Sequence, residues 1–209
     1  MDMTSLAPPR ELIHLSGISW QTYDRLLQEL SDRRLRLTYY HGRLQIMAPS
    51  PEHERYKRVI GRFVETLAEE LTLNIEPLGS ITLKHPDVSG AEPDECFYIQ
   101  NLSAIEGKTW IDLAIDPPPD LVIEIDITSS SINRLLIYAQ LGVSEIWRYD
   151  GESFEIYVLS DRQYQLAQES LAFPGIEITQ ISQFLAQVGN QAYLDIIQDF
   201  RRWIQRQLD

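Results

Sequence analysis

The sequence predicts an α/β protein in which a central mixed β-sheet is flanked by α-helices. The segment 121–127 is apolar at nearly every position, which is typical of a central strand that is buried on both faces. A helical pattern over 131–141, ended by Gly142, and a second strand over 144–149 follow it, forming a strand, helix, strand unit. Two later segments, 153–159 and 163–167, have the pattern of an antiparallel meander.

Local signals in the first third of the chain place two helices and a hairpin. Ser19 is suited to cap a helix over 19–30. Apolar residues alternate over 35–48 on either side of His41-Gly42, which predicts a β-hairpin. Ser50-Pro51-Glu52 combines a capping serine, a proline at the first helical position and an acid at the positive end of the helix dipole. A long helix from Pro51 to about Leu71 is expected.

The remaining segments complete a single domain over 1–209, with a core over about 15–185 and a terminal helix over about 188–208. The segments 78–83 and 93–99 are strand-like, and the tail over 181–208 has the pattern of an amphipathic helix. This tail has a large apolar face, made of Ala192, Tyr193, Ile196, Ile197, Phe200 and Trp203. The face could cover the sheet or meet a second subunit, and a homodimer is the expectation.

The charge balance limits the partners that the protein can have. The chain has 31 acidic and 18 basic residues, a net charge of −13, so most of its surface repels a polyanion. Contact with DNA would have to be local, at basic clusters such as Asp32-Arg33-Arg34-Leu35-Arg36, whose simpler interpretation is a solvated surface. No apolar stretch approaches the roughly 18 residues that span a bilayer, and a cytoplasmic protein with no membrane contact is expected.

Two acids lie in or beside apolar strands, where a charge is costly. Pro93-Asp94 precedes the run Cys96-Phe97-Tyr98-Ile99, and Glu124 lies inside the run 120–127. A carboxylate in such a place needs a cation or hydrogen-bond donors to offset its desolvation. A divalent metal ion shared by Asp94 and Glu124 is one explanation.

The order of several phrases along the chain resembles that of a known family. The phrases are 48–54 (Ala-Pro-Ser-Pro-Glu-His-Glu), Glu92-Pro93-Asp94, 120–125 (Asp-Leu-Val-Ile-Glu-Ile) and 138–147 (Tyr-Ala-Gln-Leu-Gly-Val-Ser-Glu-Ile-Trp). In this order they resemble the Uma-type putative restriction endonucleases, bacterial proteins assigned to the PD-(D/E)xK nuclease superfamily. The resemblance covers roughly 15–185 and implies a restriction-endonuclease-like core.

The resemblance also implies roles for individual residues. Asp94 matches the first metal-binding aspartate and Glu124 the second acid, and both would hold Mg²⁺ or Mn²⁺. The superfamily has a lysine two residues after the second acid, where this chain has Asp126. Uma-type proteins often have a lysine on the next helix, eight residues before the glycine, and this position is Arg134. Arginine keeps the charge but cannot accept a proton, so Arg134 would act on the charge of the transition state.

Four further residues have both a functional and a simpler interpretation. Glu52 could be a third metal ligand, and His53 could orient a water or contact phosphate or be an exposed residue at the helix start. Alternation puts Asp126 on the same strand face as Glu124, as a further ligand or as a cap of the following turn. Asn133 could donate to a substrate phosphate or occupy the first helical turn. Three aromatic residues, Tyr98, Tyr138 and Trp147, are assigned to the core.

The sequence hypothesis is therefore metal-dependent hydrolysis of phosphodiester bonds, with DNA as the expected substrate. A bound metal ion would lower the pKa of a water, polarise the phosphoryl oxygen and neutralise developing charge. The first alternative is a catalytically lapsed nuclease fold that acts as a binding or regulatory protein, which the missing lysine and the negative charge favour. The second is an enzyme that acts on a small phosphorylated metabolite.

Overall fold

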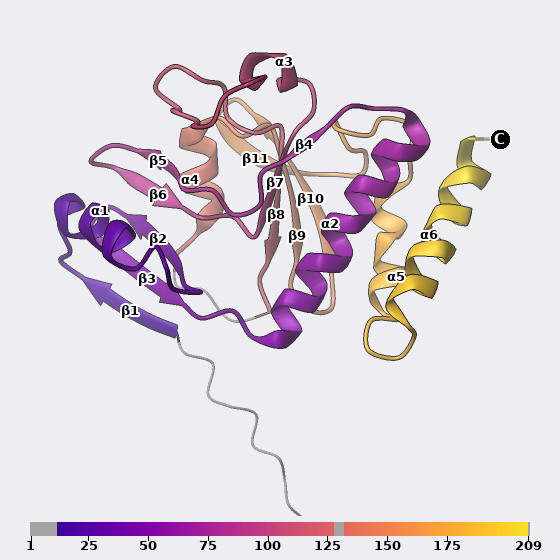
Figure 1. The fold of residues 1–209 in the computed structure, drawn as a ribbon, viewed down its shortest axis with the longest axis horizontal. Coiled ribbons are helices and arrows are strands. Elements are labelled where there is room, and N and C mark those ends of the chain that lie inside the picture. Colours follow the sequence, from indigo (N-terminus) through magenta and orange to yellow (C-terminus); the bar gives the residue numbers. More distant parts are fainter. Residues whose placement is uncertain (1–11, 128–131, 209) are drawn as a thin grey trace, which may run out of the picture.

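The computed structural model describes residues 12–127 and 132–208, whose strands form two β-sheets (Figure 1). The six-stranded sheet has the order β11 (Gln163–Ala167), β10 (Phe154–Ser160), β9 (Glu145–Tyr149), β8 (Leu121–Ile125), β7 (Glu95–Tyr98) and β4 (Glu76–Pro77). Its strands pair antiparallel except β8 and β9, which are parallel. The five-stranded sheet is antiparallel, in the order β1 (Leu12–Ser16), β3 (Arg43–Met47), β2 (Arg36–Tyr40), β6 (Ser89–Ala91) and β5 (Leu83–His85). The prediction of an α/β fold with a mixed sheet is confirmed.

The helices are α1 (Trp20–Glu29), α2 (Pro51–Leu71), α3 (Leu102–Ile105), α4 (Arg134–Leu141), the 3-10 turn η1 (Ile178–Ile181), α5 (Ser182–Leu185) and α6 (Tyr193–Leu208). The helices α1 and α2 begin and end within a residue of their predicted bounds, whereas α4 begins at Arg134 and not at Ser131. The Ser19 and Ser50 hydroxyls cap α1 and α2 by accepting from the amides three residues on. Gly142 ends α4 with a φ of 80°, a left-handed conformation that favours glycine. No helix within the two described ranges is long and apolar enough to cross a membrane.

The six-stranded sheet has a different cover on each face. On one face, the side chains of Leu121, Ile123 and Ile125 share a buried cluster with α2 and α6. On the other face, Cys96 and Val122 share a second cluster with α4 and with β5 and β6 of the smaller sheet. Figure 1 shows α2 and α6 together on one side of the sheet and the smaller sheet on the opposite side. This layered packing keeps the ends of β7 and β8 at the junction of the two sheets.

Two sequence expectations are wrong in detail. The segment 78–83 was expected to be one strand, but β4 ends at Pro77 and β5 begins at Leu83. The chain leaves the larger sheet for the smaller one between them, through Gly79 with a φ of 64°. The tail over 181–208 is likewise interrupted, because α5 and α6 are separate helices and Gly189 has a φ of 91° between them. Left-handed glycines thus divide segments whose apolar pattern is continuous.

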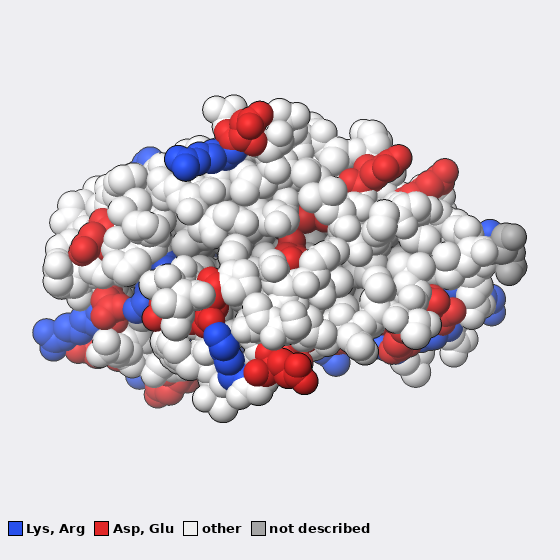
Figure 2. All heavy atoms as spheres, turned by 90° about the horizontal axis from the view of Figure 1, so that it is seen from above, with Lys and Arg blue, Asp and Glu red and all other residues white. Residues whose placement is uncertain are grey.

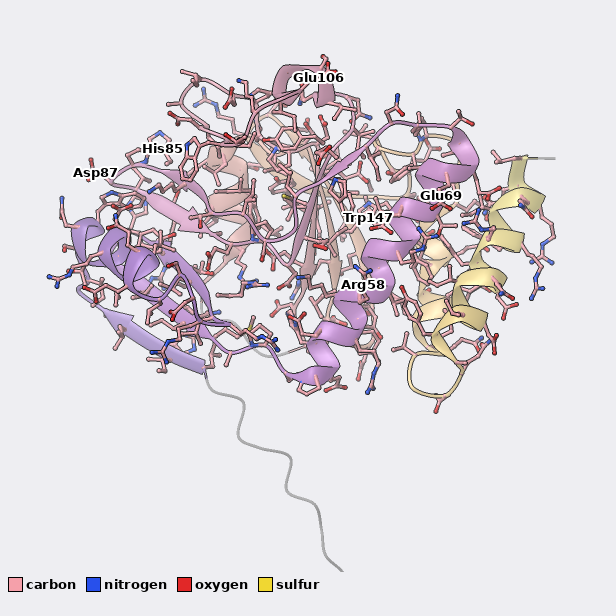
Figure 3. The ribbon with its side chains drawn as sticks, viewed as in Figure 1. Arg58, Glu69, His85, Asp87, Glu106 and Trp147 are labelled. Carbon is pink, nitrogen blue, oxygen red and sulfur yellow. The ribbon has the colours of Figure 1, made fainter. Side chains whose placement is uncertain are left out.

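The apolar face of α6 is buried within its own chain. Ile196, Ile197, Phe200 and Trp203 belong to the core cluster that α2 also lines. Beside the core, Arg201 forms ion pairs with Glu69 and Glu70 of α2, and Figure 3 shows Glu69 between the two helices. The interpretation that this face covers the sheet therefore holds for these four residues, whereas Ala192 and Tyr193 at the start of the face are exposed.

Replacing Phe200 with alanine is expected to lower the free energy of unfolding by about 3–5 kcal/mol. Phe200 is fully buried, with its ring centroid 4.1 Å from that of Phe63 and 5.3 Å from that of Phe184, so the truncation leaves a cavity. Urea denaturation measures the change, and Leu194→Ala is the matched control, because Leu194 is 65% exposed on the same helix. A Phe200→Ala protein that is fully stable but changes its oligomeric state would contradict this assignment.

Candidate active site

Asp94 and Glu124 lie on the same face of the six-stranded sheet. In the antiparallel pair β7 and β8, Cys96 is opposite Val122 and Glu95 is opposite Ile123, so the register continues to Asp94 opposite Glu124. The Asp94 amide donates to the Ile123 carbonyl at 3.2 Å, which continues the pairing. Opposed residues of an antiparallel pair project to the same side. The two acids are therefore neighbours at one end of the strands, on the side that α4 covers.

Asp94 is fully buried, and its two oxygens have different surroundings. Oδ2 accepts a hydrogen bond of 2.7 Å from the Ile125 amide, which holds the carboxylate across the two strands. Oδ1 lies 3.1 Å from Nε2 of His53, a distance typical of an ion pair, but the two atoms are not aligned for a hydrogen bond. Within the described ranges, Oδ1 thus has no hydrogen-bond partner. It is the oxygen of Asp94 that remains open to a ligand.

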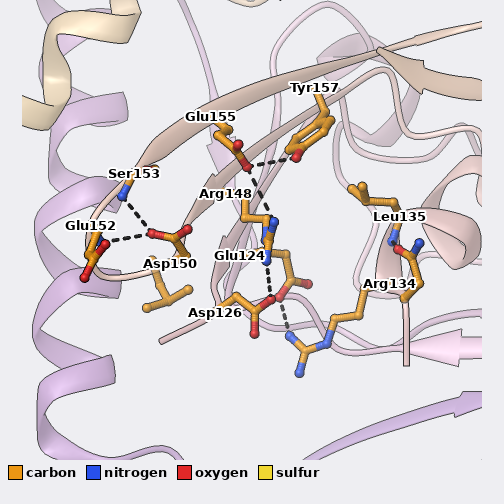
Figure 4. Close-up of polar contacts among 12 residues, drawn as sticks. Glu124, Asp126, Arg134, Leu135, Arg148, Asp150, Glu152, Ser153, Glu155 and Tyr157 are labelled. Carbon is orange, nitrogen blue, oxygen red and sulfur yellow. Dashed lines mark hydrogen bonds and ion pairs between the residues drawn. The ribbon is translucent and has the colours of Figure 1, made fainter. Parts of the chain in front are cut away.

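Glu124 is held at both of its oxygens by side chains of α4, of which Figure 4 shows Arg134. Arg134 donates from Nη1 to Oε2, and Tyr138 donates from its hydroxyl to Oε1. Residues four apart share one face of a helix, so both donors reach the strand from the same side of α4. Asn133 fixes the start of this helix, because its side chain accepts from the Leu135 amide at 3.1 Å. The side chain of Arg134 thus points from the helix toward Glu124.

Burial and mutual charge shift the pKa values of this cluster. Burial raises the pKa of Glu124 to about 7; Arg134 opposes this shift and Asp94 adds to it. Burial also acts to raise the pKa of Asp94, but His53, Arg134 and the Ile125 amide outweigh it and hold that pKa below its usual value. For Arg134, burial favours the neutral form, yet Glu124 and Asp94 raise its pKa above the usual value. The cluster thus keeps a guanidinium ion against two carboxyl groups.

A second arginine borders the same site. Arg148 of β9 is opposite Glu124 in the parallel pair β8 and β9. Its guanidinium contacts Asp126 at 2.9 Å and Glu155 at 3.4 Å. Figure 4 shows Glu124 and Asp126 between Arg148 and Arg134. These four residues line a pocket of about 350 Å³, together with Ile132, Asn133, Leu135, Tyr138 and Ile146.

The other candidate residues lie around this centre. His53 is only 2% exposed and contacts Asp94, so it is not the exposed helix-start residue of the simpler interpretation. Glu52, its neighbour in the first turn of α2, is exposed. Asn133 caps α4 and lines the pocket, and Asp126 lines the pocket as the ion-pair partner of Arg148. The turn 128–131 that Asp126 was alternatively expected to cap lies outside the described residues.

Two residues of the site were not identified from the sequence. Tyr138 lies in the core, as the sequence predicts, but its hydroxyl also donates to Glu124, because it follows Arg134 by one helical turn and faces the same strand. Arg148 was not considered, although the parallel pairing of its strand places it beside Glu124. Both residues lie within the strand, helix, strand unit that the sequence predicts. Given that unit, helical spacing identifies Tyr138 and strand register identifies Arg148.

The described residues hold no cluster of three or more His, Cys, Asp or Glu side chains in metal-binding geometry. The side chains that could bind a metal ion here are the two carboxylates of Asp94 and Glu124. Mg²⁺ is commonly bound through one or two carboxylates, with waters and substrate phosphate completing its octahedron. A pair of neighbouring acids is therefore sufficient in number for such an ion.

Comparison with known proteins gives a family and a distant structural likeness. The chain is similar over 71% of its length to the crystal structure of a putative nuclease of the DUF820 group from Anabaena variabilis ATCC 29413. The likeness covers 90% of that protein at 15% identity and a TM-score of 0.49. No curated protein matches the sequence significantly. The model of the Uma2 family, described as putative restriction endonucleases, matches residues 20–189, and the chain belongs to this family.

Proposed function

We propose that the protein is a metal-dependent endonuclease that hydrolyses phosphodiester bonds in DNA. The observation that carries the proposal is the buried pair Asp94 and Glu124, which lie on one face of the sheet with the guanidinium of Arg134 beside them. Such a site combines ligands for a hard cation with a fixed positive charge for a phosphate group. Both features suit phosphoryl chemistry, in which electrostatic stabilisation supplies most of the rate.

The donor atoms fit a divalent cation of the Mg²⁺ or Mn²⁺ type. Oδ1 of Asp94 is a buried carboxylate oxygen without a hydrogen-bond partner among the described residues, so a cation there would satisfy it. Glu124 would be the second ligand and would release Arg134 or Tyr138 from one of its oxygens. A divalent cation bound here supplies an activated water and polarises the phosphoryl oxygen. Glu52 as a third ligand and Asp126 as a further catalytic acid stay predictions.

The side chains around Asp94 and Glu124 have other roles in the proposed reaction, in phosphate binding and in orienting the two carboxylates. Arg134 and Arg148 present guanidinium groups to the pocket, where they can bind phosphoryl oxygens and offset the charge that develops on them. His53 acts through Asp94, because it fixes the orientation of that carboxylate from α2. Tyr138 does the same for Glu124 from α4. Asn133 lines the pocket, where a contact with substrate is proposed.

The proposals for the substrate, the cellular location and the oligomeric state rest on the family and on the net charge, and not on the geometry of the site. The family is described as putative restriction endonucleases, which favours DNA as the polymer. The net charge of −13 limits contact with DNA to a local surface near the site. A cytoplasmic location and a homodimer stay predictions, and no dimer face is assigned now that the apolar side of α6 is buried.

One observation favours a second candidate, a lapsed nuclease that binds nucleic acid without cleaving it. Both oxygens of Glu124 already accept from Arg134 and Tyr138, and Asp126 occupies the usual lysine position. The guanidinium of Arg134 thus already occupies the Glu124 carboxylate, and a metal ion would have to compete with it for this ligand.

The purified protein is expected to nick supercoiled plasmid in the presence of Mn²⁺ and to lose this activity when a chelator removes the metal. The physical reason is that neither His53 nor Arg134 replaces the water activation that a cation supplies. Gel electrophoresis of the plasmid measures nicking, and calorimetric titration with Mn²⁺ measures binding. Plasmid that stays intact although Mn²⁺ binds would favour the lapsed nuclease.

A further inference from the structure

Three arginines line a pocket at the start of β2 in the smaller sheet, and this pocket is separate from that of the candidate active site. Arg33 and Arg34 are exposed on the segment before β2, and Arg36 is the first residue of that strand. With Pro49, Pro51 and Glu54 they line a pocket of about 640 Å³. Arg36 pairs with Met47 at the end of β3, so the arginines and the linker into α2 meet at one end of the hairpin. Segments that are separate in sequence thus form one basic pocket.

The arginines of this pocket are poorly neutralised by the rest of the protein. Arg33 has an exposed ion pair with Asp32 at 3.4 Å, which contributes little to stability. In the described chain, Arg34 and Arg36 have no carboxylate at ion-pair distance, and Nε of Arg36 is buried without a hydrogen-bond partner. Elsewhere, arginines contact acids closely, as Arg62, Arg148 and Arg201 do. Nη1 of Arg36 donates to the Leu35 carbonyl at 3.5 Å, so the donors of Arg34 and Nε of Arg36 are the ones that leave the pocket suited to an anion.

The acids that face the pocket are few and are partly engaged. Glu54 is in its wall and lies 3.7 Å from Nδ1 of His53. Glu92 interacts electrostatically with Arg36, but its carboxylate also accepts from the Leu37 amide at 2.8 Å and the Thr82 hydroxyl at 3.1 Å. The lining of the pocket thus contains three guanidinium groups and one carboxylate, that of Glu54.

Two connections fix this pocket beside the proposed active site. The first turn of α2 carries Pro51 and Glu54 in the pocket wall and, between them, His53 in contact with Asp94. The hydrogen bond from the Leu37 amide to Glu92 joins β2 to the phrase Glu92-Pro93-Asp94. The pocket wall and the contact with Asp94 are thus carried by one turn of α2, which rises about 5.4 Å.

We propose that Arg33, Arg34 and Arg36 form a docking pocket for the DNA backbone, which holds phosphates next to the phosphate that is cleaved. The proposal rests on the proposed nuclease function and names the surface by which an acidic protein can hold its substrate. The face seen in Figure 2 carries only scattered Lys and Arg side chains among acidic and neutral ones. A concentrated basic pocket near the acids supplies the local attraction that the overall charge lacks.

The test compares two double variants with the same loss of charge. Arg33→Gln/Arg34→Gln removes two exposed guanidinium groups from the pocket. Arg25→Gln/Arg202→Gln removes two exposed groups from α1 and α6, where each pairs with an acid of its own helix. Fluorescence anisotropy with a labelled 20-base-pair duplex, without metal and at several salt concentrations, measures binding. The triple variant Arg33→Gln/Arg34→Gln/Arg36→Gln is added if circular dichroism shows that it folds.

The pocket variant is expected to bind the duplex at least tenfold more weakly, and its plot of log K against log salt should be less steep by about 0.9 for each phosphate that it no longer neutralises. The control variant should bind like the wild type. Equal binding by both double variants would overturn the proposal, as would a wild type that does not bind the duplex. Plasmid nicking is scored separately: a wild type that binds through the pocket but does not nick supports the pocket and removes the nuclease function.

Discussion

The Asp94→Asn protein is expected to cleave plasmid about 10³-fold more slowly than the wild type and to bind Mn²⁺ too weakly for calorimetry. Removing one of two carboxylate ligands costs several kcal/mol of charge stabilisation, and about 1.4 kcal/mol corresponds to tenfold in rate. The fold should persist, because an asparagine oxygen can still accept from the Ile125 amide that now donates to Oδ2. The measurements are a Mn²⁺ titration and the initial rate of nicking.

Asp161→Asn is the matched control, because Asp161 is exposed in the turn between β10 and β11 and has a φ of 49°. Asparagine tolerates this conformation well, so neither metal binding nor cleavage should change. If Asp94→Asn and Asp161→Asn bound Mn²⁺ with the same affinity, the metal site would have to be placed elsewhere.

Replacing Arg134 with alanine is expected to reduce the turnover number by about 10²–10³-fold while leaving Mn²⁺ affinity equal or higher. Arg134 places a cation on Glu124, so its removal frees that carboxylate for the metal. The same removal takes away a charge that acts on the transition state, and such a charge affects kcat rather than ground-state binding. Single-turnover cleavage at saturating Mn²⁺ separates the two effects.

Arg134→Lys should keep much of the activity, because the positive charge at this position is retained. Arg202→Ala, which removes an exposed guanidinium from α6, is the charge control and should leave the rate unchanged. A rate that survives Arg134→Ala, or a Mn²⁺ affinity that falls in parallel with the rate, would assign Arg134 to the structure of the site and not to its chemistry.

The sequence predicted those elements whose signals are local. The caps Ser19 and Ser50, the hairpin turn at His41-Gly42 and the glycine after α4 are short-range features, and the structure has each helix and strand that they indicate. The pairing of β6 with β2 depends on segments about 50 residues apart, and nothing in either segment specifies its partner. The separate smaller sheet could therefore not be predicted.

In the candidate site, too, some features have local signals in the sequence and others depend on long-range packing. Asp94 and Glu124 stood out because a charge in an apolar strand needs an explanation, and the strand register places them side by side. The contact between His53 and Asp94 joins α2 to β7 across the interior, so its buried position could not be read from neighbouring residues. Long-range packing, and not local preference, decides which side chains surround a buried acid.

The position of α6 in the chain affects how the protein folds during synthesis. The ribosome makes every strand of the six-stranded sheet before it makes Phe200, Trp203 and Ile204, which pack on α2 in the finished protein. The side of α2 that bears Phe63 therefore lacks part of its packing until those residues emerge. The helix that carries His53 to Asp94 thus receives its final support last, after both carboxylates of the site have already been translated.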